Sequence, residues 1–156
     1  MQTIILSCLI TLCFSSAAQA QVSINNAWVR ATVPQQKVTG AFLQINSAHD
    51  ATLIAVRSPA AAIVALHKME MVDNVMKMRA IPGLDLPAGT NVELKPGGYH
   101  IMFFKLKEQV KEGDIIPITL VIEGKNKKRE TIEVQAIAKP LQQTGKPAMQ
   151  PGHHAH

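Results

Sequence analysis

Short apolar segments separated by turn residues run through most of the chain, and this pattern constrains the fold most. Proline and glycine interrupt the segments at points such as Pro82-Gly83, Pro87-Ala88-Gly89 and Pro96-Gly97-Gly98, where proline presets φ and glycine tolerates positive φ. The stretch between the first two is expected to be a loop. No segment has the pattern of a long helix, so we predict an all-β, antiparallel β-sandwich. Strands are expected at residues 23–33, 38–46, 51–57, 63–71, 75–81, 90–94, from 100 onward, 115–122 and 129–138.

The chain of 156 residues is expected to hold one folded domain, at residues 21–139, between two segments of other composition. Residues 1–20 have the pattern of an export signal: an apolar run from Ile4 to Phe14, then Ala18-Gln19-Ala20 as a small-x-small cleavage site. An uncleaved membrane anchor is the alternative, but the apolar run is short for a bilayer. No stable membrane insertion is therefore expected after cleavage.

Both cysteines, Cys8 and Cys13, lie inside the expected signal. Neither has the sequence context of lipoprotein cleavage, because Leu12 is too large before Cys13 and Cys8 lies too near the terminus. The mature chain is therefore expected to contain no thiol. This suits an oxidising compartment, where thiolates would form disulfides and thioethers would not.

Methionine and histidine gather between residues 67 and 102. Side chains of a strand alternate between its faces, so His67 shares a face with Met69 and Met71, and His100 shares one with Met102. Thioether sulfur with imidazole nitrogen is a ligand set for a soft metal ion, and copper(I) is the first candidate. The chain has seven methionines, and five fall in this window: Met69, Met71, Met76, Met78 and Met102.

Taken singly, Met69, Met71 and Met76 are expected to be core or surface residues rather than ligands. The spacing of the others is more specific: ten residues separate His67 from Met78, and twenty-one separate Met78 from His100-x-Met102. This motif resembles that of the bacterial PCuAC copper-chaperone family, over roughly residues 24–137. Further segments resemble the family too: Asn26-Ala27-Trp28-Val29-Arg30-Ala31, Val75-Met76-Lys77-Met78-Arg79, Leu94-Lys95-Pro96-Gly97-Gly98-Tyr99-His100 and Lys111-Glu112-Gly113-Asp114.

The resemblance implies a cupredoxin-like Greek-key β-sandwich exported to the periplasm, most simply as a monomer. It implies copper(I) binding by His67, Met78, His100 and Met102, with Met69 as an additional ligand. It also implies delivery for assembly of the CuA site of cytochrome c oxidase. The partner would be subunit II of that oxidase or a thioredoxin-like copper-insertion protein.

Several other functions fit the chain less well. A blue-copper electron carrier needs a cysteine ligand that the mature chain lacks, and no nucleophile is paired with a base placed by a motif, so an enzyme is not expected. A copper-scavenging or storage protein stays open as an alternative. The formal charge of +5 is too diffuse to indicate nucleic-acid binding.

Two further features have structural expectations. Trp28 is expected in the core. The basic turn at residues 125–129 is expected to be a solvated hairpin tip, with docking to an acidic partner as an alternative.

Residues 140–156 are rich in proline, glutamine and glycine and are expected to form a flexible tail. The tail carries possible ligands for copper(II), which imidazole accepts more readily than thioether does. A merely solvated terminus is the alternative. The candidate ligands of the tail are Met149, His153, His154 and His156.

Deleting residues 140–156 should reduce copper(II) uptake and leave the fold and copper(I) affinity of the domain nearly unchanged. Uptake by the full-length mature chain should also fall as the pH drops through the histidine range, because protonated imidazole does not bind metal. Equilibrium dialysis against copper(II) measures both effects. An unchanged copper(II) stoichiometry after truncation would assign the tail no metal.

Overall fold

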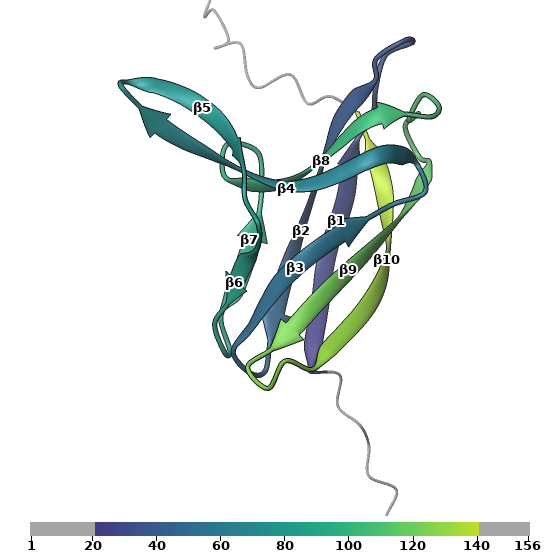
Figure 1. Cartoon of the computed structure of the whole chain (residues 1–156). Coiled ribbons are helices and arrows are strands. Elements are labelled where there is room, and N and C mark those ends of the chain that lie inside the picture. The colour runs from purple at the N-terminus through teal and green to yellow at the C-terminus, as the bar shows by residue number, and fades with distance from the viewer. Residues whose placement is uncertain (1–20, 141–156) are drawn as a thin grey trace, which may run out of the picture.

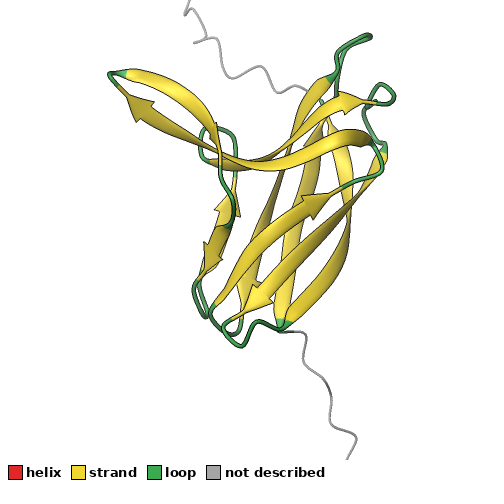
Figure 2. Ribbon diagram, in the orientation of Figure 1, coloured by secondary structure: helices red, strands yellow, loops and turns green. Residues whose placement is uncertain are grey.

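The structure, a computed structural model, describes residues 21–140, which form ten strands and no helix (Figures 1 and 2). Within these residues no helix is therefore long and apolar enough to cross a membrane. The strands are β1 (Val22–Arg30), β2 (Val38–Ser47), β3 (Ala51–Arg57), β4 (Ala61–Val72), β5 (Val75–Ala80), β6 (Leu84–Leu86), β7 (Asn91–Leu94), β8 (Tyr99–Leu106), β9 (Ile115–Gly124) and β10 (Arg129–Lys139).

One continuous sheet folds over on itself to make the two layers of a sandwich (Figure 1). Strands far apart in sequence lie side by side, as β2 does with β8, and the expected cupredoxin-like Greek-key fold is confirmed. The pairings are antiparallel except that of β1 with β10, which is parallel. The strands follow the order β5-β4-β8-β2-β1-β10-β9-β3-β6. The strand β7 pairs with the second half of β2, whose first half pairs with β8.

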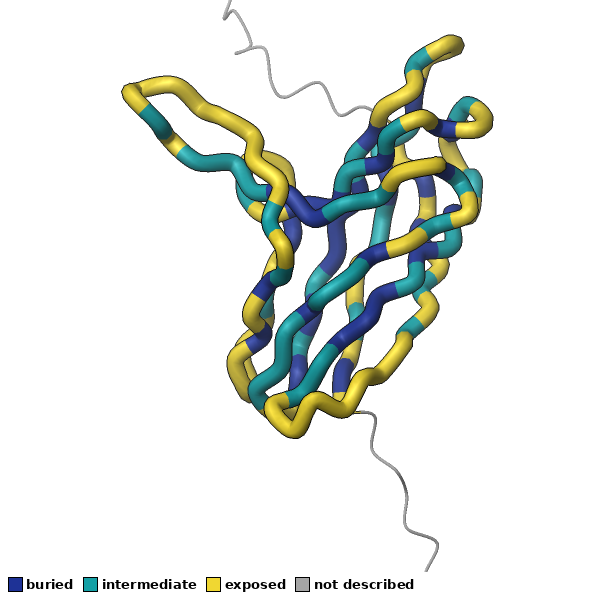
Figure 3. Tube along the Cα trace, in the orientation of Figure 1, coloured by how far each residue is buried: buried dark blue, intermediate teal, exposed yellow. Residues whose placement is uncertain are grey.

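The core lies between the layers and consists of aliphatic side chains with few aromatic ones. Alternate residues of β8 enter it, since Ile101 and Phe103 are fully buried. Figure 3 shows the buried segments on the central strands, whereas β5 is exposed along its length. Other fully buried core residues are Val29, Leu43, Ile45, Leu53, Leu86, Leu94, Ile118 and Leu120. A strand with one buried face keeps its register, because a shift by one residue would expose every core side chain.

The expected loop between residues 82 and 89 is wrong in part, because Leu84–Leu86 forms the short strand β6. Leu84 pairs with Leu53 of β3, and Leu86 pairs with Ala51. Both leucines are buried while Asp85 between them is exposed. This alternation over three residues is the pattern of a half-buried strand, but it is too short to stand out in the sequence.

The prediction that Trp28 belongs to the core is also wrong, because Trp28 is half-buried on the outer face of β1. A β-bulge interrupts the pairing of β1 with β2 between Asn25 and Trp28, and Asn26 takes a φ of 52°. A bulge adds one residue to a strand and so reverses which side chains face inward. Val29 consequently enters the core, and Trp28 stacks on Phe42 at a ring-centroid distance of 4.4 Å.

Replacing Phe103 with alanine should lower the free energy of unfolding by about 3–5 kcal/mol, because it removes a buried ring and leaves a cavity. The exposed Val33 is the control, and Val33→Ala should change the stability by about 0.5 kcal/mol or less. Urea unfolding of both variants tests this. Similar losses for the two would contradict the position of Phe103 in the core.

Candidate metal centre

His67 and His100 face each other across two neighbouring strands. In the pairing of β4 with β8, His67 lies directly opposite His100, and the next pair is Leu66 with Ile101. Leu66 and Ile101 point into the core, so the two histidines project from the outer face of the sheet. Strand alternation therefore places the imidazoles side by side, outside the sandwich core.

Methionines lie on both sides of this histidine pair along β4. Met102 is opposite Ala65, two positions to one side of His67, and Met69 is opposite Met78 of β5, two positions to the other side. All of these positions share the face of His67, because each lies two residues from it or is paired with such a residue. The structure thus gathers His67, Met78, His100 and Met102 on one face, with Met69 beside them.

The turn before β8 orients the ring of His100. Pro96 and Gly97 form its centre, Gly97 has a φ of 81°, and the N–H of Gly98 donates to the carbonyl of Lys95 at 3.1 Å. The carbonyl of Gly98 then lies 2.9 Å from Nδ1 of His100. Because a carbonyl only accepts, Nδ1 of the neutral ring carries the proton, and Nε2 then presents its lone pair.

That lone pair is directed at a thioether. Nε2 of His100 lies 3.2 Å from Sδ of Met78. In tetrahedral sites a metal lies about 2.0 Å from an imidazole nitrogen and about 2.3 Å from sulfur, which puts the two donors about 3.5 Å apart. The two atoms are therefore placed almost as two ligands of one ion would be.

The ring of His67, next to that of His100, has an unsatisfied nitrogen. The residue is 9% exposed, and its Nδ1 is the buried side-chain polar atom without a hydrogen-bond partner in residues 21–140. Its ring centroid lies 5.9 Å from that of His100, so the two imidazoles are neighbours. Burial lowers the pKa of His67, and the neighbouring His100 lowers it further, which favours the neutral form that binds metal.

Two aromatic rings and a glycine shape the surroundings of the histidines. Phe104 lies 5.6 Å from the ring of His67, and Phe42 lies 6.5 Å from that of His100, between centroids. Gly40 is paired with Met102, and a Cβ there would lie 3.1 Å from the Phe42 ring. A cleft of about 300 Å³ opens here, lined in part by Gly40, Phe42, Met69, His100 and Met102.

Other residues singled out in the sequence lie elsewhere. Met71 and Met76 are 61% and 46% exposed, so both are surface residues of the β4–β5 hairpin, which agrees with one of the two expectations. His49 lies in the exposed turn after β2, away from the histidine pair. Within residues 21–140 no three His, Cys, Asp or Glu side chains gather as a metal site. The tail residues Met149, His153, His154 and His156 and the expected signal peptide lie outside the described residues.

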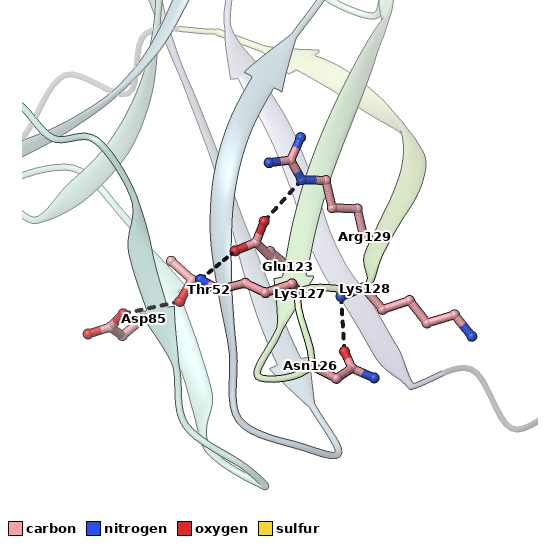
Figure 4. A network of polar contacts seen from close by, with 7 residues as sticks. All are labelled: Thr52, Asp85, Glu123, Asn126, Lys127, Lys128 and Arg129. Atoms are coloured by element: carbon pink, nitrogen blue, oxygen red, sulfur yellow. Dashed lines mark hydrogen bonds and ion pairs between the residues drawn. The ribbon is translucent and has the colours of Figure 1, made fainter.

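The basic turn between β9 and β10 is largely neutralised by neighbouring carboxylates (Figure 4). Glu123 accepts from Lys127 at 3.2 Å and from Arg129 at 3.0 Å, and these two partners hold the pKa of Glu123 below its usual value. Lys125 pairs with Asp50 at 2.6 Å. These pairs agree with a solvated hairpin tip.

The sequence suggests candidate ligands but does not indicate the residues that position and enclose them. Gly40 and Phe42 lie in a strand whose pattern gave no sign of a site. The sequence indicates a turn at Gly98, and only the folded turn shows that its carbonyl holds His100. The adjacent Asn25-Asn26 within a strand was the one available signal for the bulge that turns Trp28 outward.

Comparison with known proteins identifies similar chains. Residues 22–136 match the family model described as "Putative lipoprotein LpqE-like". The "Putative lipoprotein Lxx21020" of Leifsonia xyli subsp. xyli is 34% identical over 102 residues, which cover 64% of this chain and 60% of that relative.

Solved structures of PCuAC domains have the same fold. The copper-bound PCuAC domain from PmoF2 is 20% identical, with a TM-score of 0.57, and the match covers 77% of this chain and 95% of that one. The solution structure of CuI-DR1885 from Deinococcus radiodurans is 28% identical, with a TM-score of 0.56, covering 80% and 83%. These matches confirm the resemblance to PCuAC domains.

The imidazole of His100 should carry its proton on Nδ1 when it is neutral, because Gly98 offers only an acceptor. Long-range ¹H–¹⁵N correlation spectra of the metal-free protein distinguish the two tautomers. The exposed His49 is the internal control and should show the averaged pattern of a solvated ring. An Nε2-protonated His100 would contradict the hydrogen bond to Gly98.

Proposed function

The chain belongs to the LpqE-like family, and on this premise we propose that it is an exported copper(I) carrier rather than an enzyme. The ligands are His67, Met78, His100 and Met102. The observation that carries the proposal is the 3.2 Å approach of Nε2 of His100 to Sδ of Met78, with the proton of His100 held on Nδ1. The unpartnered Nδ1 of the buried His67 supports a third donor at the same place.

The ligand chemistry favours the lower oxidation state of copper. Two imidazoles and two thioethers are neutral, so the charge of the loaded site is that of the ion alone. Thioether sulfur is a soft ligand and selects copper(I). Residues 21–156 contain no cysteine, so the site lacks the thiolate that a blue-copper centre uses.

The relatives support copper as the cargo. The structure from PmoF2 is described as copper-bound, and that of DR1885 as its CuI form. Met69 lines the cleft together with His100 and Met102. We assign Met69 as an additional ligand that takes part while copper enters or leaves.

The proposed destination is the CuA site of cytochrome c oxidase. The acceptor would be subunit II of that oxidase or a thioredoxin-like copper-insertion protein in the periplasm. Copper(I) would pass by ligand exchange from thioethers to the thiolates of the acceptor, which bind it more strongly. The carrier would act as a monomer, and its export agrees with the lipoprotein names of the family and of the Leifsonia relative.

Copper scavenging or storage in the same compartment is the second candidate function. The histidines of the segment 140–156 favour it, because a tail that captures copper(II) would raise the amount of metal held per chain. The two functions use the same domain site and differ in whether the ion is passed on. Transfer of copper(I) to the apo CuA domain of an oxidase subunit II would favour the carrier.

Replacing His100 with alanine or Met102 with leucine should weaken copper(I) binding at the domain site by about tenfold or more, because each change removes a ligand. Met71→Leu is the matched control and should leave this affinity unchanged. Competition with a chromogenic copper(I) chelator under reducing conditions measures the affinities, and X-ray absorption of the wild-type protein should show both nitrogen and sulfur ligands.

Circular dichroism should show that the three metal-free variants stay folded, because the substituted side chains lie outside the core. Equal affinity losses in all three would contradict the ligand assignment. A first shell without sulfur would contradict the proposed site as a whole.

A further inference from the structure

We propose that Met71 and Met76, together with Met69, form a second, outer copper(I) site on the β4–β5 hairpin. Copper(I) would bind there first and then move along the hairpin to the histidine pair. This inference rests on the proposed function, because it supplies the route by which copper reaches the domain site.

A tight turn fixes the two outer methionines opposite each other. Asp73 and Asn74 both have positive φ, 51° and 59°, which is the geometry of a two-residue hairpin turn. Met71 is therefore paired with Met76, two positions beyond the pair of Met69 with Met78 and on the same face. Cβ atoms of directly opposite residues lie about 4.5–5.5 Å apart, so two flexible thioethers can reach one ion between them.

The sulfur-bearing pairs form a ladder that leads to the histidines. Successive positions on one face of a strand lie about 7 Å apart. The order along β4 from the turn is Met71 with Met76, then Met69 with Met78, then His67, which lies opposite His100. A long side chain such as that of Met69 can therefore serve the outer site and the domain site in turn.

Packing does not account for these outer methionines. The hairpin projects away from the body of the sandwich (Figure 1), and Met71 and Met76 are 61% and 46% exposed. Exposed apolar side chains on a hairpin at the edge of a sheet add nothing to the core and favour aggregation. A role that needs accessible sulfur explains both their residue type and their exposure.

The two faces of the hairpin differ in charge. Glu70 accepts from Lys68 at 2.8 Å and from Arg79 at 2.7 Å, and these residues, with Lys77, alternate with the methionines and so lie on the opposite face. The methionine face of the hairpin, from His67 to Met71 and from Met76 to Ala80, carries no acidic or basic side chain other than His67. The ion pair of Glu70 with Arg79 bridges β4 and β5 and supports the register on which the sulfur pairs depend.

The transfer is a ligand exchange that conserves charge and electrons. Copper stays in the +1 state, and each bond to Sδ of Met71 or Met76 is replaced by one to Met78 or to a histidine nitrogen. Thioethers bind without losing a proton, so loading of the outer site releases none. Three thioethers without imidazole make the weaker site, and the ion therefore moves inward.

The test uses the mature full-length chain with ¹³C-labelled methionine methyl groups, titrated with copper(I) under a reductant. At equilibrium we expect the first equivalent to shift the methyl signals of Met78 and Met102, because the domain site is the stronger one, and further copper to shift those of Met71 and Met76.

The rate of loading tests the order of entry. In Met71→Leu/Met76→Leu, transfer from a chromogenic copper(I) chelate to the domain site should slow several-fold, while the copper(I) affinity of the domain site stays unchanged. Leucine keeps the volume and removes the sulfur. Val75→Leu, a change on the same hairpin that leaves every sulfur in place, is the control and should transfer copper at the wild-type rate.

Two outcomes separate this inference from the proposed function. If Met78 and Met102 respond but Met71 and Met76 never shift, and the double variant loads at the wild-type rate, the outer site is refuted and the carrier stands. If neither Met78 nor Met102 responds to copper(I), the proposed function fails, and the outer site fails as an entry to it. Site-resolved methyl signals also keep copper bound by Met149 or by the tail histidines apart from the hairpin.

Discussion

The register of β4 against β8 is the constraint on which the candidate site depends. It pairs Leu66 with Ile101 in the core and, at the next position, His67 with His100 outside it. A slip by one residue would turn the histidines into the core and the aliphatic side chains out, at the cost of several buried contacts. The hydrophobic core therefore holds the two imidazoles in place, although neither is part of it.

This arrangement leaves a local conflict in the metal-free protein. Nδ1 of His67 is buried without a hydrogen-bond partner, and such an atom costs about 1–3 kcal/mol. The low pKa of His67 reflects the same burial, since a charged ring would be worse still. Because this pKa is lowered in the folded state, the resulting stability is present above the usual histidine pKa and is lost as the pH falls through the pKa of His67. A metal ion bound at Nδ1 would remove the conflict.

The sequence predicts most of the strands, and which candidate ligands share a strand face, because both depend on local alternation. Residues 51–57 form a strand with the expected ends, and His100 and Met102 share one face of β8 as expected. The spacing of His67, Met78, His100 and Met102 indicated their common site only through resemblance to a family. What brings them together is the pairing of three strands, and no single segment of the sequence contains that information.

The aromatic residues around the site, Trp28 and Phe42, are positioned by contacts between strands that the local sequence pattern does not predict. Alternation along β1 puts Trp28 in the core, and only the bulge at Asn26 turns it outward, where it stacks on Phe42. Phe42 in turn lies beside His100, and Gly40 leaves the space next to Met102. Three features of β1 and β2 thus shape the cleft: the positive φ of Asn26, the stacked ring of Trp28 and the glycine at position 40. Neither strand contains a residue of the ligand motif. A substitution that removed the bulge would disturb the site without touching a ligand, because it would return Trp28 toward the core and withdraw its support from Phe42.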